Sequence, residues 1–394
     1  MQRPSPSDLL EYLIAFDTTS RESNLPLIEF VRDYLASWGV DSVTIPEPSG
    51  SKASLFATIG PPDVPGVILS GHTDVVPVDG QSWTSEPFHL DIRDERFYGR
   101  GTADMKGFLA CVLAAVPGFA AAQLPVPVHL AFSYDEEVGC LGAPALIDAL
   151  LERVARPRAC IVGEPTGMDV VTGHKGKVAV ACTVRGWETH SATPQYGVNA
   201  VEIAAEMVAR ARREAAGLRE GPVDDAFDPP YSTLHTGTIH GGTALNIVPG
   251  ACRFELELRH LPELDPQHVL RALETFADEN LLPAMREVAP ASAIEWQRVS
   301  SYPALETTDT GLVSLIRELS GGGQVRKVSF GTEAGLYQAA GIQTVVCGPG
   351  SIADAHKADE FVEMSQMEAC ERFLERLRGH LLREAAPDPE ETPR

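Results

Sequence analysis

Two histidines and three acidic residues lie at or just beyond the ends of segments that read as buried strands or tight loops. They are His72, Asp104, Glu137, Glu164 and His356. Imidazole and carboxylate groups are common zinc ligands, and a tetrahedral zinc that keeps one position open for water takes three of them. Five such residues therefore favour two metal ions that share one carboxylate, as in two-metal hydrolytic centres.

A sixth acidic residue, Glu136, directly precedes Glu137. In a two-metal site its carboxylate would remain uncommitted to metal and could accept a proton from the attacking water. Taken alone, a histidine in a loop is more often a surface residue, and adjacent acids usually form a solvated turn. The repetition of such residues at several strand ends favours a functional site.

Buried strands are predicted directly before most of the candidate ligands. Apolar runs at 67–69, 128–132, 160–162 and 344–347 lead to His72, Glu137, Glu164 and His356, respectively. In open α/β sheets, ligands bind in the crevice outside the carboxyl ends of the strands. The sequence therefore predicts that these side chains meet at one edge of a sheet.

The length of the chain, 394 residues, predicts two domains, because a single hydrophobic core stops growing beyond about 250 to 300 residues. Strands and helices alternate up to about residue 175, as in an α/β layer protein. Residues 176–300 then read as strand, helix, strand, strand, helix and strand. This order predicts a small split sandwich inserted into the larger domain.

The expected fold class is α/β, with a mixed-sheet catalytic domain formed by residues 1–175 and 301–383. The insert, 176–300, is expected to be an α+β domain of βαββαβ, ferredoxin-like order. Its predicted strands are 178–184, 232–239, 252–259 and 293–298, and its predicted helices are 198–212 and 266–279. Residues 321–359 are expected to be rich in loops, and the Pro- and Glu-rich residues 384–394 to be disordered.

The composition argues against several classes of partner. A formal charge of −23, from 55 acidic and 32 basic residues, would repel a nucleic-acid backbone or an anionic membrane surface. No apolar stretch approaches the roughly 20 residues that cross a bilayer, and residues 1–8 lack the pattern of a secretory signal. Seven cysteines without a C-x-x-C pair favour reduced thiols in the cytoplasm.

Five motifs resemble one known family. They are GHTDVVP at 71–77, GTADMKG at 101–107, DEEVG at 135–139, GEPT at 163–166 and AH at 355–356. Together they resemble the M20 metallopeptidase family, which includes acetylornithine deacetylase, succinyl-diaminopimelate desuccinylase and aminoacylase. The resemblance covers nearly the whole chain except the tail.

The resemblance implies a role for each residue of the predicted site. His72 and Glu164 would bind one zinc, Glu137 and His356 the other, and Asp104 would bridge them; cobalt and manganese are the alternative metals. Asp74 would accept the remaining ring N–H of His72 and fix its tautomer.

Glu136 would be the general base and would later give its proton to the leaving amine.

The insert carries a further candidate, His190. In the family, a histidine at this place reaches across a dimer interface to stabilise the tetrahedral oxyanion, which implies a homodimer. Here Thr189 stands where glycine is common. The alternative is that His190 only satisfies hydrogen bonds of its own loop.

Two other residues of the insert, Asn246 and Arg259, match positions that bind the substrate carboxylate in related enzymes. An arginine offers a planar fork that fits a carboxylate, here the α-carboxylate of an N-acyl amino acid. Arg259 also closes an amphipathic strand, so it could instead be a surface residue.

Three further strings, GHKG at 173–176, FGTEA at 330–334 and GPGS at 348–351, look more like acetylornithine deacetylases than desuccinylases. We hypothesise that Glu333 contacts a cationic substrate side chain such as the δ-ammonium of ornithine. The alternative is that Thr332 caps a helix and Glu333 is an acid of its first turn.

The expected activity is removal of the acetyl group from N2-acetyl-L-ornithine, giving acetate and L-ornithine for arginine synthesis, with water as the nucleophile. Another M20 deacylase is the alternative, acting on a succinylated or other N-acyl amino acid or on a dipeptide. A non-catalytic relative that binds metal or amino acids would be expected to lack the base or a ligand, and this chain lacks neither.

Overall fold

The computed structural model describes residues 3–384. Apart from Glu384, the predicted disordered tail therefore lies outside the described residues. Within them the chain forms two compact units, one made of 3–173, 305–327 and 332–384 and the other of 174–304 and 328–331. No helix in this part of the chain is both long and apolar enough to cross a membrane.

The first unit is built on a mixed sheet. Among the described residues the sheet has nine strands in the order β1-β2-β6-β3-β7-β15-β8-β13, and β14 pairs with β8. Its strands are β1 (Ser42–Pro46), β2 (Ala53–Ile59), β3 (Val67–His72), β6 (Val128–Ser133), β7 (Ala159–Val162), β8 (Val170–His174), β13 (Leu305–Glu306), β14 (Val325–Val328) and β15 (Gln343–Val346). A small sheet of order β16-β5-β4 comprises β4 (Asp91–Arg93), β5 (Arg96–Tyr98) and β16 (Phe361–Glu363).

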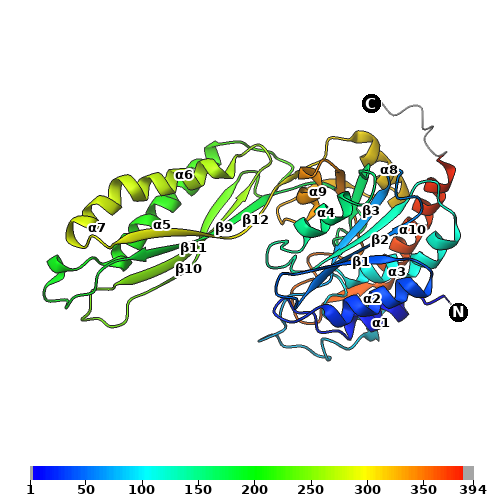
Figure 1. The fold of residues 1–394 in the computed structure, drawn as a ribbon, viewed down its shortest axis with the longest axis horizontal. Coiled ribbons are helices and arrows are strands. Elements are labelled where there is room, and N and C mark those ends of the chain that lie inside the picture. Colours follow the sequence, from blue (N-terminus) through cyan, green and yellow to red (C-terminus); the bar gives the residue numbers. More distant parts are fainter. Residues whose placement is uncertain (1–2, 385–394) are drawn as a thin grey trace. The chain divides into compact units, whose positions relative to one another are not determined.

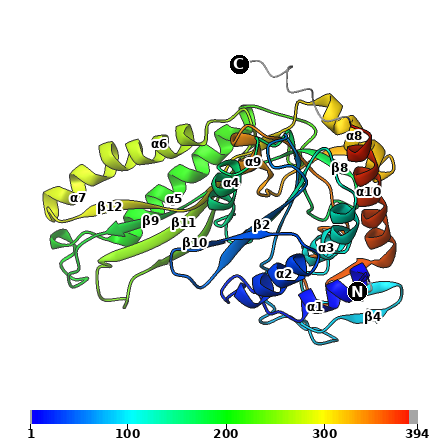
Figure 2. The same ribbon diagram turned by 45° about the vertical axis from the view of Figure 1, so that its right-hand side comes forward.

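Helices cover both faces of the large sheet (Figures 1 and 2). One group contributes to the main hydrophobic core: α1 (Pro6–Ile14), α2 (Leu25–Ser37), α3 (Lys106–Ala121), α8 (Thr310–Ser320) and α10 (Met364–Arg383). The helices α4 (Ala143–Leu151) and α9 (Ala334–Ala339) lie on the other face. Both faces of the central strands are therefore excluded from water.

This double cover explains the composition of the central strands. Every residue of β3, β6 and β7 is buried, and a strand buried on both faces reads as a continuous apolar run. β3 pairs in parallel with β6 and β7, and β15 pairs in parallel with β7. The four strands therefore end at the same edge.

The second unit is a four-stranded antiparallel sheet of order β10-β11-β9-β12. Its strands are β9 (Gly176–Arg185), β10 (Thr233–Gly241), β11 (Ala251–His260) and β12 (Ala293–Tyr302), and its helices are α5 (Ala200–Gly217), α6 (Pro266–Phe276) and α7 (Leu282–Val288). Buried and more exposed residues largely alternate along β11, as expected for a sheet with one covered face. The helices pack on that face, and the order is βαββαβ when α6 and α7, which a π-helical stretch joins, are counted as one helix (Figure 1).

The α/β class with an inserted α+β unit agrees with the prediction, but the loop-rich prediction for 321–359 is only partly right. That stretch contains β14, α9 and β15, and β15 lies inside the large sheet between β7 and β8. β14 and β15 have four residues each and α9 has six. The apolar run at 344–347 predicts β15, whereas β14 and α9 carry too few residues to show a clear period.

One buried histidine of the large sheet gives the fold a dependence on pH. His129 on β6 is fully buried, and its Nδ1 lies 3.0 Å from the hydroxyl of Thr58. Among the described residues its Nε2 has no hydrogen-bond partner. Burial lowers the pKa of His129 to about 4, so the folded chain keeps the ring neutral.

We predict that His129→Gln reduces the loss of stability in acid. Below pH ~6.5 the unfolded chain binds the proton first, so stability falls as the pH falls toward the folded-state pKa. By pH about 4.5 this effect amounts to about 2 to 3 kcal/mol of unfolding free energy. Urea denaturation of both proteins at pH about 7 and about 4.5 measures it, and identical losses for the two proteins would contradict the prediction.

Candidate metal centre

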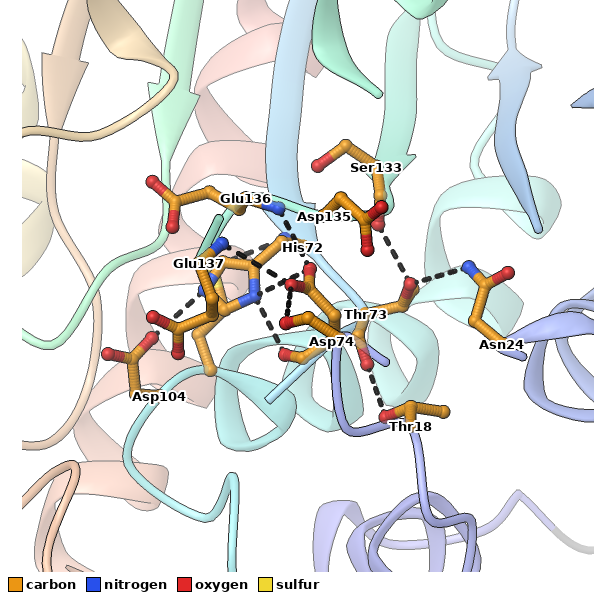
Figure 3. Close-up of polar contacts among 12 residues, drawn as sticks. Thr18, Asn24, His72, Thr73, Asp74, Asp104, Ser133, Asp135, Glu136 and Glu137 are labelled. Atoms are coloured by element: carbon orange, nitrogen blue, oxygen red, sulfur yellow. Dashed lines mark hydrogen bonds and ion pairs between the residues drawn. The ribbon is translucent and has the colours of Figure 1, made fainter. Parts of the chain in front are cut away.

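Four neighbouring parallel strands bring candidate ligands to one edge of the large sheet. His72 is the last residue of β3, Glu136 and Glu137 follow β6, and Glu164 follows β7. His356 lies in the longer loop after β15. Asp104 joins them from the turn before α3, which runs beneath this edge (Figure 3).

Asp104 lies between the two histidines. Its Oδ1 is 2.9 Å from His72 Nε2, and its Oδ2 is 3.0 Å from His356 Nε2. Two ligands of a tetrahedral zinc lie about 3.3 Å apart, because each is about 2.0 to 2.1 Å from the metal. One carboxylate that offers a different oxygen to each imidazole has the geometry of a bridging ligand.

The other acids divide between the two histidines. Glu137 Oε1 lies 3.0 Å from His356 Nε2, and Glu164 Oε1 lies 3.7 Å from His72 Nε2. Ligand atoms of His72, Glu136 and Glu164 all lie within 4.8 Å of one another, as do those of His72, Asp104 and Glu137. The structure thus gathers all five predicted ligands and the predicted base.

The electrostatics of this cluster favour a cation. Burial, together with neighbouring carboxylates, raises the pKa of Glu136 to about 8, that of Glu137 to about 7 and that of Glu164 well above its usual range. Burial opposes protonation of His356, but hydrogen bonds to Asp104 and Glu137 raise its pKa to about 10. Buried carboxylates this close repel one another unless a cation or a proton compensates them. The residues present fit a site for metal ions.

The sequence of the chain also matches known proteins. The sequence profile described as peptidase family M20/M25/M40 matches residues 68–378. The chain belongs to this family. Its M20 relatives include acetylornithine deacetylase of Myxococcus xanthus, 36% identical over 96% of this chain and 97% of that protein. Acetylornithine deacetylase of Pasteurella multocida is 34% identical over 95% of this chain and 98% of that protein.

Solved M20-type structures share the fold. The M20 metallo-carboxypeptidase Sso-CP2 of Sulfolobus solfataricus superposes with a TM-score of 0.77 at 18% identity, over 96% of this chain and 99% of that one. A dinuclear metal-binding M20 peptidase of Bacillus subtilis gives 0.64 at 14% identity, over 96% and 98%. Family and relatives together identify this M20 protein as a metal-dependent hydrolase of amide bonds.

Asp74 contacts both His72 and the acidic turn, the segment that carries Glu136 and Glu137. His72 Nδ1 lies 2.9 Å from the backbone oxygen of Asp74 and 3.5 Å from its carboxylate, so the nearer acceptor is the carbonyl and not the predicted carboxylate. The carboxylate accepts the N–H groups of Glu136 and Glu137, at 3.0 and 3.3 Å, and the hydroxyl of Ser20 (Figure 3). Asp74 thereby fixes the His72 ring through its backbone and the acidic turn through its side chain.

Two glycines let α3 approach the site. A Cβ on Gly71, next to His72, would lie 2.5 Å from Met105 Cε, and one on Gly163, next to Glu164, would lie 2.1 Å from the ring of Phe108. Gly163 is therefore needed for the close packing of Phe108 of α3, whereas a side chain at Gly71 would require the flexible end of Met105 to shift.

Glu333 is held by two strands of the large sheet. Its side chain is fully buried, and its two carboxylate oxygens accept the hydroxyls of Ser70, at 2.5 Å, and Ser133, at 2.7 Å. Thr332 Oγ1 accepts the N–H of Ala334 at the start of α9, but the N-cap residue of α9 is Glu333 and its first turn contains no acid. Since these serines belong to β3 and β6, Glu333 ties α9 to the two strands, and this burial does not favour a direct contact with a substrate cation.

The second unit holds the remaining predicted residues. His190 is exposed, and its Nδ1 accepts the N–H of Ala192 at 3.1 Å. In the neutral ring Nε2 then carries the proton and can donate a hydrogen bond. The backbone N–H of Ser191 donates to the backbone oxygen of Asn246 at 3.1 Å, so the loops of His190 and Asn246 lie side by side.

The guanidinium of Arg259 already forms hydrogen bonds within the second unit. Its Nε donates to Glu257 Oε1 at 2.7 Å and its Nη1 to the hydroxyl of Tyr302 at 2.9 Å. The side chain keeps 27% of its exposure. A substrate carboxylate would have to share this guanidinium with Glu257 or displace it.

Sequence reasoning missed several residues around the site. Lys52 forms a buried ion pair with Asp135, next to the base, and Glu360 accepts the N–H groups of Ala103 and Asp104. An acid four residues after His356 was the available signal, but nothing in the local pattern indicated that it is buried. Charged residues are almost never fully buried unless paired.

We predict that Asp104 is needed for both metal ions and His356 for one. Asp104→Ala removes the carboxylate between the two histidines, whereas His356→Ala leaves the His72 and Glu164 side intact. Zinc per chain, measured by elemental analysis after dialysis, should fall more in Asp104→Ala than in His356→Ala. Equal zinc content in Asp104→Ala and the wild type would contradict a bridging role.

We predict that Glu333→Gln slows hydrolysis of different substrates alike. The change disturbs the contacts with Ser70 and Ser133, which do not depend on the substrate side chain. Measured kcat/KM should fall by similar factors for N-acetylornithine and N-acetylmethionine. A loss confined to N-acetylornithine would restore the direct-contact hypothesis.

Proposed function

We propose that this protein hydrolyses N2-acetyl-L-ornithine to acetate and L-ornithine in the cytoplasm, as a step of arginine synthesis. The observation that carries the proposal is the full-length similarity, at 34% to 36% identity, to acetylornithine deacetylases. The centre at the strand ends supplies the chemistry that such a reaction needs.

The ligand set divides into two halves that share Asp104. His72 and Glu164 would hold one zinc, and Glu137 and His356 the other, with cobalt or manganese as alternative metals. The distances from Asp104 to both imidazoles support this division. When bound, the pair of ions would polarise the amide carbonyl and lower the pKa of the attacking water.

Glu136 would move the proton. It lies on the His72 and Glu164 side of the cluster, and it keeps some exposure to solvent. Its carboxylate would take a proton from water as the oxygen attacks the acetyl carbon, and would return that proton to the leaving amine nitrogen. Its backbone N–H is held by Asp74, so the base is fixed relative to His72.

The second unit would bind the rest of the substrate. His190 Nε2 would donate to the developing oxyanion, and Asn246 and Arg259 would bind the α-carboxylate. The neutral tautomer fixed by Ala192 supports the donor role of His190. We propose that the active form is a homodimer, in which the second unit acts as lid and dimerisation domain.

A hydrolysis panel tests the substrate. With zinc or cobalt added, N2-acetylornithine should give the highest kcat/KM among N-acetylornithine, N-acetylmethionine, N-succinyl-diaminopimelate and simple dipeptides. Release of free amine measures each rate. A higher kcat/KM for the succinylated substrate or a dipeptide would replace the proposed substrate by that one.

Glu136→Gln is the matched control for this panel. Loss of general acid and base catalysis lowers rates by about 10²- to 10⁴-fold, while zinc per chain should stay at the wild-type value because the ligands remain. A Glu136→Gln protein with near-normal turnover would refute the assigned base.

A further inference from the structure

We propose that Glu360, acting with Arg100 and Gln81, is a positioning residue that sets the backbone of the two ligands Asp104 and His356. This inference rests on the proposed two-metal centre. It adds a group of residues that hold the ligands through hydrogen bonds to their backbone.

Glu360 lies behind Asp104. Its Oε1 accepts two consecutive N–H groups, from Ala103 at 2.9 Å and from Asp104 at 3.1 Å. Its Oε2 accepts Arg100 Nη1 at 2.5 Å. Both oxygens of the carboxylate are therefore used, and one of them fixes the peptide groups on either side of Ala103. That contact determines where the Asp104 carboxylate points.

Arg100 continues the chain of contacts toward the second ligand. Its Nη2 donates to Gln81 Oε1 at 2.5 Å, and Gln81 Nε2 donates to the backbone oxygen of His356 at 3.1 Å. Trp83 Nε1 also donates to Gln81 Oε1, and its ring lies 5.1 Å from the Arg100 guanidinium carbon. One polar network thus joins the backbone of Asp104 to that of His356.

His356 needs such support more than the other ligands do. Its side chain is 44% exposed, whereas those of His72, Asp104, Glu137 and Glu164 are between 1% and 8% exposed. It lies in a loop and has a φ of 60°, in the left-handed region that non-glycine residues rarely adopt. Packing alone does not fix the position of His356. The hydrogen bond from Gln81 to its backbone oxygen therefore contributes more to that position than it would for a buried ligand.

The energetics argue for a positioning role over a purely stabilising one. Arg100 and Glu360 are both fully buried, and the desolvation of a buried ion pair largely offsets its Coulomb attraction. The pair is thus weak evidence for added stability. Glu360 accepts the amides of Ala103 and Asp104, and Arg100 binds the glutamine that holds His356. These partners indicate that the pair controls the geometry of the ligands.

The test is the zinc affinity of the full-length Glu360→Gln protein. Glutamine keeps the size but replaces one oxygen by an NH₂ group, which cannot accept from either the amides or Arg100. Outer partners of metal ligands typically contribute 10- to 100-fold in affinity, so zinc affinity should fall by about that factor. Zinc is titrated into metal-free protein against a competing chelator, well below the melting temperature of each variant.

Glu363→Gln is the matched control, because Glu363 lies three residues further on in an exposed pair with Arg96. Its zinc affinity should stay within about twofold of wild type. Activity of Glu360→Gln should recover as zinc is raised, since the catalytic groups are intact. Gln81→Ala, which leaves the buried ion pair in place, should weaken only one of the two zinc ions.

The outcomes separate the two proposals. If the wild type binds no stoichiometric zinc, the two-metal centre fails and the positioning role fails with it. If the wild type binds two zinc ions and Glu360→Gln and Gln81→Ala bind them equally well, the positioning role alone is wrong. A lower melting temperature with unchanged zinc affinity in both variants assigns the network to stability only and likewise overturns it.

Discussion

The constraint on which the rest of this structure depends is the close packing of buried carboxylates around two imidazoles. Asp104 offers one oxygen to His72 and the other to His356, while Glu136, Glu137 and Glu164 crowd the same space. Such a cluster stays charged only if cations balance it. The parallel strands, the tight turns and the glycines beside the ligands all serve to bring these like charges together.

A second theme is that acidic side chains outside the ligand set hold the ligand-bearing segments by their backbone. Asp74 accepts the amides of Glu136 and Glu137, and Glu360 accepts the amides of Ala103 and Asp104. Every residue except proline has a backbone N–H group, so this support does not depend on the ligand side chain. The carboxylate of Asp74 also adds negative charge beside the ligands, whereas that of Glu360 is paired with Arg100.

Much of this centre could be predicted from sequence, because its parts obey local rules. A buried strand reads as an apolar run, and the residue after it falls at the sheet edge, which located His72, Glu137 and Glu164. The insert was recognisable because its strands alternate and its helices have a clear period. These signals need only a few neighbouring residues each.

What the sequence could not show depends on long-range contacts. Glu360 binds Asp104 across 256 positions, and Glu333 binds Ser133 across 200. An isolated glutamate in a sequence looks the same whether it faces water, a substrate or two serine hydroxyls. The hydrogen bonds of Glu333 to Ser70 and Ser133 are such contacts, and β14 and α9 were too short to be separated from loop.

The position of β15 has a consequence for the order in which this chain can fold. β15 (Gln343–Val346) lies between β7 and β8 in the large sheet. In the sequence, however, the entire insert separates β15 from these two strands. During synthesis on the ribosome, β7 and β8 emerge long before their shared neighbour, so the nascent sheet has unpaired edges inside its future core. Such edges can pair with other chains, which makes this stage a point at which a chaperone would protect the growing polypeptide.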